Sequence, residues 1–100
     1  MLIQKELEIV VDGKGLYNIT DIINQAISKH RISKGICTIF IKHTSASLII
    51  QENADPNVLK DLENYYDKIV PEKDNYLHSQ EGPDDMPAHI KSSLTNTTLN

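Results

Sequence analysis

The chain has four histidines, and three of them are candidate metal ligands. These three, His43, His78 and His89, lie outside the regular apolar patterns, whereas His30 ends a helical pattern where a cation complements the helix dipole. Their separations of 35 and 11 residues match no local zinc signature. If three different elements brought these imidazoles together, they would form the open three-ligand set of a catalytic metal. Imidazole suits several divalent metals, of which zinc is the default prediction; the alternative is three ordinary surface or hydrogen-bonded histidines.

Small hydroxyl residues directly follow the first of these histidines. Thr44, Ser45 and Ser47 come at the end of an apolar run, where small side chains let the backbone approach an anion closely. Their hydroxyls and backbone N–H groups could therefore bind a phosphate of a substrate. An ordinary polar turn is the alternative interpretation.

Two carboxylates are the candidates for orienting a histidine or for accepting a proton. Asp61 lies in a helical pattern, and Asp85 begins the pattern that contains His89. The structural alternatives are a solvated charge for Asp61 and a helix cap for Asp85. Nucleophilic catalysis is disfavoured, because there is no G-x-S-x-G motif and Cys37 lies in an apolar run where cysteine is usually inert packing.

Length and composition restrict the class of protein. One hundred residues and 11.3 kDa predict a single domain spanning residues 1–100. The net charge of −4, with no basic cluster, argues against a nucleic-acid partner. No apolar run is long enough to cross a membrane. The lone cysteine and the absence of a signal-peptide pattern at the start predict a cytoplasmic protein.

The elements that must position the candidate residues follow from the periodicity of apolar side chains. Alternation predicts a half-buried strand over residues 2–11, and a mostly apolar run predicts a central strand, covered on both faces, over 36–41. Spacings of three and four predict helices, one of them capped by Asp55-Pro56. The helices are expected over about 19–30, from 56 to before Pro71, and from about 84 to 94; further strands are expected over 48–52 and from 95. The order of elements predicts an α+β fold.

Five ordered blocks carry a resemblance to a known family: H-T-S-A-S (43–47), E-N-A-D-P (52–56), Asp61, Y-L-H (76–78) and E-G-P-D-D-M-P-A-H-I-K (81–91). They closely resemble the YjbQ-like family, commonly labelled secondary thiamine-phosphate synthase. The resemblance implies an α+β fold, a mixed or antiparallel β-sandwich with flanking helices that assembles as a homotrimer. It also implies a metal, taken as zinc, held by His43, His78 and His89.

The chain departs from the family pattern at its C-terminal end. Family members continue with further strands that include a W-Q-G motif, a glutamate and an arginine, whereas this sequence ends at Asn100 and has no tryptophan. The resemblance therefore implies that the C-terminal strands are missing. A fold that lacks them would depend more strongly on its trimer partners.

Two hypotheses of function follow. The first is a trimeric, metal-dependent enzyme that acts on a phosphorylated small molecule, for which the resemblance implies a weak or promiscuous thiamine-phosphate synthase activity, a transferase reaction. A metal-dependent phosphate-ester hydrolase is the alternative within the enzyme class. The second hypothesis is a non-catalytic trimer that binds a metal or a metabolite.

Overall fold

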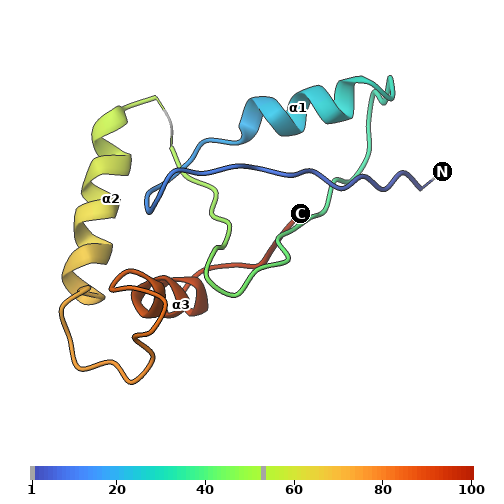
Figure 1. Ribbon diagram of the computed structural model, residues 1–100. Coiled ribbons are helices and arrows are strands. Elements are labelled where there is room, and N and C mark those ends of the chain that lie inside the picture. The colour runs from blue at the N-terminus through green and yellow to red at the C-terminus, as the bar shows by residue number, and fades with distance from the viewer. Residues whose placement is uncertain (1, 53) are drawn as a thin grey trace.

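A computed structural model describes residues 2–52 and 54–100, and its elements follow in the order α1, β1, α2, α3, β2 (Figure 1). Their bounds are α1 Thr20–Ser28, β1 Ile39–Phe40, α2 Pro56–Ile69, α3 Asp85–Ser93 and β2 Thr98–Leu99. The α+β class predicted from the sequence is confirmed. Among the described residues, the sheet of the expected sandwich is one antiparallel pair of short strands.

The sheet is built around the C-terminal segment. β1 and β2 pair antiparallel, with Ile39 opposite Leu99, and the Ile41 N–H donates to the Thr97 carbonyl at 2.9 Å. The same segment exchanges two backbone hydrogen bonds with Leu48, at 2.7 and 3.3 Å, through Asn96. The C-terminal segment therefore pairs with residues just before and just after residues 42–47. This pairing holds both ends of the 42–47 segment next to the C-terminal segment.

The helices match the sequence expectations closely. α2 begins at Pro56, and the Asp55 carboxylate caps it by accepting from the Asn57 N–H at 2.9 Å. It ends at Ile69, before Pro71, whose ring cannot continue a helix. α1 and α3 lie inside the ranges predicted for them.

The predicted strands are less regular than expected. Residues 2–11 run as an extended chain (Figure 1) with no assigned strand, yet the expected alternation persists: Ile9 is 38% exposed and its neighbour Val10 is 87% exposed. The prediction that the 36–41 run is covered on both faces is wrong, because Phe40 is 58% exposed and Cys37 is also exposed. Within the described residues, β1 pairs with β2 alone in a two-stranded sheet, and the Phe40 side chain stays exposed.

Among the described residues the buried core is small, with members from the segment after β1, the end of α2 and α3. Its members are Leu48, Val70 and Pro87. The radius of gyration is 15.8 Å, larger than the roughly 13 Å typical of a compact 100-residue domain. Many large apolar side chains are consequently exposed, Leu77 completely so.

Charged side chains tie the turn after the first extended segment to two helices. Asp67 of α2 accepts from Lys14 at 3.2 Å and from Lys91 of α3 at 3.1 Å, and Lys14 also pairs with Glu72 at 2.9 Å. The Lys91 hydrogen bond, followed by the one from Lys14, holds the pKa of Asp67 below its ordinary value against partial desolvation. The hydrogen bonds to Glu72 and Asp67 raise the pKa of Lys14. Together these contacts link α2, α3 and the 12–15 turn.

In the described part of the chain, no helix combines the length and the apolar character that crossing a membrane requires.

Candidate metal centre

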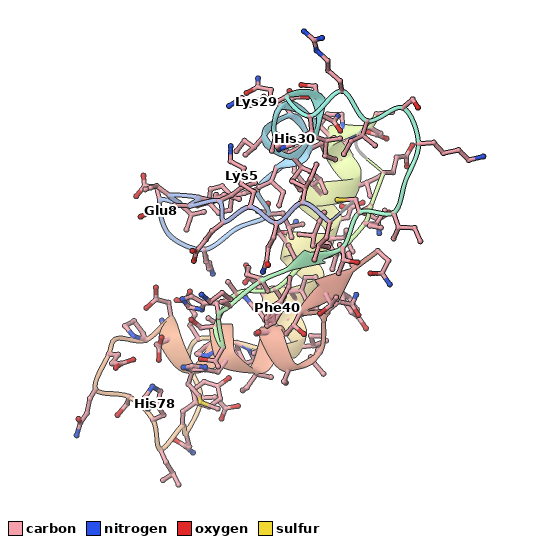
Figure 2. The ribbon with its side chains drawn as sticks, turned by 90° about the vertical axis from the view of Figure 1, so that its right-hand side faces the viewer. Lys5, Glu8, Lys29, His30, Phe40 and His78 are labelled. Carbon is pink, nitrogen blue, oxygen red and sulfur yellow. The ribbon has the colours of Figure 1, made fainter. Side chains whose placement is uncertain are left out.

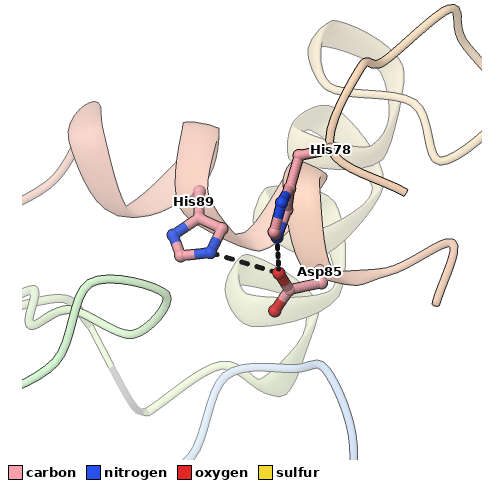
Figure 3. A group of neighbouring side chains, drawn as sticks. All are labelled: His78, Asp85 and His89. Atoms are coloured by element: carbon pink, nitrogen blue, oxygen red, sulfur yellow. Dashed lines mark hydrogen bonds and ion pairs between the residues drawn. The ribbon is translucent and has the colours of Figure 1, made fainter. Parts of the chain in front are cut away.

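The start of α3 and the loop before it bring two histidines to one carboxylate (Figure 3). Asp85 and His89 are four residues apart on α3, so both side chains project from the same face of the helix. His78 reaches the same place from the loop between α2 and α3. The Asp85 Oδ2 atom lies 2.6 Å from the His78 Nε2 atom and 3.2 Å from the His89 Nε2 atom.

The three side chains form a compact group. One ligand atom from each of His78, Asp85 and His89 lies within 4.8 Å of the other two. The two imidazole rings pack edge to face, with their centroids 5.5 Å apart. Glu81 adds a carboxylate oxygen 3.5 Å from the His78 Nε2 atom. Two nitrogens and at least one carboxylate oxygen therefore converge on a common point.

The carboxylate of this group is held in its charged form. The His78 hydrogen bond is the main cause that lowers the pKa of Asp85, with smaller contributions from Glu81 and from the charges of the two histidines. Partial desolvation opposes this effect, since the Asp85 side chain is 21% exposed. A charged carboxylate is the form in which aspartate binds a metal.

The protonation of His89 follows from its second hydrogen bond. Its Nδ1 atom lies 3.0 Å from the carbonyl oxygen of Thr44, which can only accept. Nδ1 therefore carries a proton, and Nε2 is the ring nitrogen directed at Asp85. A histidine that donates its other N–H to a backbone carbonyl is the usual arrangement for a metal ligand.

The dimensions of the group suit a small divalent cation. Zinc bonds of about 2.0–2.1 Å in tetrahedral geometry place neighbouring ligand atoms about 3.3 Å apart. The His89 to Asp85 separation of 3.2 Å already matches this value, and the His78 to Asp85 separation would have to open from 2.6 Å. Either a proton on the His89 Nε2 atom or a cation between the two atoms satisfies this contact with the carboxylate. His78, Asp85 and His89 thus fit a metal such as zinc.

His43 is positioned differently from the other two candidate histidines. It lies on the 42–47 segment, exposed, and is not a member of the group that converges on Asp85. Its Nδ1 atom accepts from the backbone N–H of Ser45 at 2.9 Å and lies 3.1 Å from the Ser45 hydroxyl. Of the predicted trio, the structure therefore brings together His78 and His89.

The remaining predicted residues are placed as follows. Thr44 contributes its carbonyl to His89, and Ser47 makes a hydroxyl contact with Thr95. Ser45 holds the ring of His43. Asp61 is exposed on α2 and does not belong to the His78, Asp85 and His89 group. Of the two predicted carboxylates, it is Asp85 that lies among the histidines.

Side chains of α3 hold the 42–47 segment next to the His78, Asp85 and His89 group by hydrogen bonds. The Ser92 hydroxyl donates to the Ala46 carbonyl at 3.0 Å and is nearly buried. Together with the His89 to Thr44 bond and the Ser47 to Thr95 contact, this makes three side-chain links between one segment and the region of α3. Sequence reasoning missed Ser92, because a serine within a helical pattern carries no signal of a distant carbonyl partner.

His30 lies far from this centre. It follows the end of α1, and Figure 2 shows it at the opposite end of the molecule from His78. Its exclusion from the candidate ligands is consistent with this placement.

Comparison with known proteins defines the family. A sequence profile of the UPF0047 protein YjbQ-like family matches residues 5–100. This match, on an α+β fold, defines the class of protein as YjbQ-like. The chain belongs to the UPF0047 protein YjbQ-like family.

Relatives with known sequences support the same assignment. The chain is 51% identical over 96 residues to UPF0047 protein sll1880 of Synechocystis sp., covering 95% of this chain and 65% of that protein. It is 43% identical over 100 residues to UPF0047 protein YjbQ of Escherichia coli O157:H7, covering 99% of this chain and 72% of that protein. The chain thus spans about two thirds of the length of these relatives.

Solved structures agree with the fold. The conserved hypothetical protein TT1486 of Thermus thermophilus superposes with a TM-score of 0.79 at 34% identity, over 93% of this chain and 70% of that one. A YjbQ/UPF0047 family protein of Clostridium acetobutylicum superposes with a TM-score of 0.71 at 34% identity, over 86% and 69% of the two chains. These names state no activity.

Proposed function

We propose that this protein is a metal-dependent enzyme that acts on a phosphorylated small molecule, with a divalent metal, zinc by default, held by His78, Asp85 and His89. The observation that supports this proposal is the convergence of two Nε2 atoms on the Asp85 Oδ2 atom, at 2.6 and 3.2 Å. Three protein ligands leave a fourth position of a tetrahedral metal open for substrate or water. An open position is the feature that distinguishes a catalytic site from a structural one.

The chemistry assigned to the centre depends on that open position. A bound divalent metal supplies a Lewis acid that polarises a phosphate oxygen. Thr44 orients His89 through its carbonyl, and the exposed Thr44 side chain is available to the phosphate. Glu81, 3.5 Å from His78 and exposed, is placed to orient that imidazole or to take a proton.

The particular reaction is proposed from the family resemblance. A weak thiamine-phosphate synthase would join the nitrogen of a thiazole phosphate to the methylene carbon of an aminopyrimidine that carries a pyrophosphate ester on that carbon. The new C–N bond forms as the C–O bond breaks, and pyrophosphate leaves. A metal-dependent phosphate-ester hydrolase is the second candidate, because the same open position could hold an activated water. A homotrimer and a cytoplasmic location complete the proposal; the exposed apolar side chains support association with further chains.

Metal binding is tested first, with single variants of the proposed ligands. Equilibrium dialysis against zinc followed by elemental analysis should give about one metal per chain for the wild type. His78→Ala, Asp85→Asn and His89→Ala should each bind far less, and His30→Ala is the matched control because His30 lies far from the centre. Binding that is equal in all five proteins would contradict the proposal.

The reaction is tested in cells and in solution. Expression of the chain in a thiamine-requiring strain should restore growth, and His78→Ala should abolish this effect while leaving the protein level unchanged. If the wild type fails to restore growth but releases inorganic phosphate from phosphate esters in a zinc-dependent manner, the hydrolase is the correct version. If neither activity is found in a metal-loaded protein, the non-catalytic binding role replaces the enzyme.

A further inference from the structure

The ring of His43 is held in one tautomer by its own loop. The backbone N–H of Ser45 points at the His43 Nδ1 atom at 2.9 Å, and a backbone N–H can only donate. The Nδ1 atom must therefore be an acceptor, and the Ser45 hydroxyl, 3.1 Å away, can donate to the same lone pair. In its neutral form, the His43 imidazole consequently carries its proton on Nε2. The exposed end of the ring is an N–H group.

This arrangement is the opposite of the one at His89. There, Nδ1 donates to the Thr44 carbonyl and the lone pair of Nε2 faces the proposed metal position. At His43 the loop occupies the lone pair and leaves a proton on the free nitrogen. To bind a metal through Nε2, the His43 ring would have to move that proton to Nδ1 and lose the hydrogen bond from the Ser45 N–H, since ligation needs the Nε2 lone pair.

We infer that His43 is a substrate-binding residue and not a metal ligand: its fixed Nε2–H group donates a hydrogen bond to an anionic phosphoryl oxygen of the substrate. This inference deepens the proposed function and rests on it for the metal centre. It replaces the three-histidine ligand set expected from the sequence by two histidines and Asp85, and it assigns the third histidine to the phosphate.

The space beside His43 is open and has a lysine among its lining residues. His43 lines an open hollow of about 490 Å³, together with Phe40, Ile41, Lys42, Thr44 and Thr97. Lys42 supplies a positive charge; its pair with Glu6, at 3.3 Å, joins side chains that are 75% and 83% exposed. Such an exposed pair is weak, so an incoming phosphate can displace Glu6.

The hollow adjoins the metal centre through a single residue. Thr44 follows His43 in the chain, and its carbonyl accepts the Nδ1–H of His89. A phosphoryl group bound by His43 would therefore lie next to the residue that orients a metal ligand. The segment itself is held by the Ser92 to Ala46 bond, so its position does not depend on the substrate.

Nuclear magnetic resonance can read the tautomer directly. Two-bond nitrogen–proton correlations of protein labelled with ¹⁵N-histidine, recorded at a pH where the imidazoles are neutral, should show His43 protonated at Nε2 and His89 protonated at Nδ1. Ser45→Ala should leave the His43 pattern unchanged, because the backbone donor remains. A His43 ring protonated at Nδ1 would overturn the inference whatever the metal does.

Binding measurements separate this inference from the proposed function. Zinc should bind His43→Gln within about twofold of the wild-type affinity and should be lost in the matched variant His89→Gln. Inorganic phosphate, titrated into the zinc-loaded protein, should bind His43→Leu, which has no donor, about tenfold more weakly, the loss typical of one hydrogen bond to a charged group. If His43→Gln loses zinc, or His43→Leu keeps full phosphate affinity, the inference is wrong and the metal centre can still stand. If the wild type binds no zinc, the proposed function is wrong, and phosphate titration of the metal-free protein still tests His43.

Discussion

Ser92 offers the clearest test of how α3 holds the 42–47 segment. Its hydroxyl donates to the Ala46 carbonyl at 3.0 Å, and the residue is 8% exposed. Ser92→Ala would leave that carbonyl without this donor in a site with little access for water. The cost of an unsatisfied buried partner is about 1–3 kcal/mol of unfolding free energy. For a domain of this size, each kcal/mol lowers the melting temperature by about 4–8 °C.

The neighbouring serine is the matched control. Ser93 is exposed, and its hydroxyl bonds to the Ile90 carbonyl within its own helix at 2.6 Å. Ser93→Ala should therefore change the unfolding free energy by no more than about 0.5 kcal/mol. Urea and thermal unfolding of both variants, followed by circular dichroism at equal protein concentration, measure the difference. Equal stability of the two variants would refute the role given to Ser92 in anchoring the segment.

Three further predictions concern the cap of α2, the charge network and the metal. Asp55→Ala should lower the unfolding free energy by about 1 kcal/mol, seen in urea titrations, because it removes the cap on the Asn57 N–H. Asp67→Asn should lower the unfolding free energy at neutral pH, because the charged Asp67 carboxylate is stabilised by its two lysine partners. This difference from wild type should vanish as the pH falls from about 3.8 through the lowered pKa of Asp67, since a depressed carboxyl pKa stabilises the fold only above that range. A difference that stays constant across an acid titration would contradict the network. Zinc at 100 times its dissociation constant should stabilise the wild type by about 2.7 kcal/mol in thermal unfolding. A chelator should reverse this gain, and Asp85→Asn should not show it; an equal gain in that variant would place the zinc elsewhere.

The helices could be predicted from the sequence because their signals are local. Asp55-Pro56 marks the start of α2 and Pro71 closes the pattern, as found. The strands depend on distant partners, and the alternation over residues 2–11 says nothing of which chain pairs with them. The extended segment therefore keeps a less exposed side, with Ile9, and a more exposed side, with Val10. Within the described residues it forms no strand with another segment.

The candidate site was predictable in part for the same reason. The spacing of Asp85 and His89 places both on one helix face, and that much can be worked out from the sequence. The arrival of His78 and the separate position of His43 depend on the paths of two loops. The tautomer of each ring depends on hydrogen bonds to backbone groups up to 45 residues away, as between His89 and Thr44, and no local pattern encodes them.

The most direct test of the central claim is the zinc-edge X-ray absorption spectrum of the metal-loaded protein. The account predicts a first shell of nitrogen and oxygen atoms at about 2.0–2.1 Å, with the outer-shell scattering of two imidazoles, from His78 and His89, and with Asp85 as an oxygen ligand. The spectrum of His43→Gln should be the same. A first shell with three imidazoles that drops to two in His43→Gln would contradict the account, and so would a shell that is unchanged in Asp85→Asn.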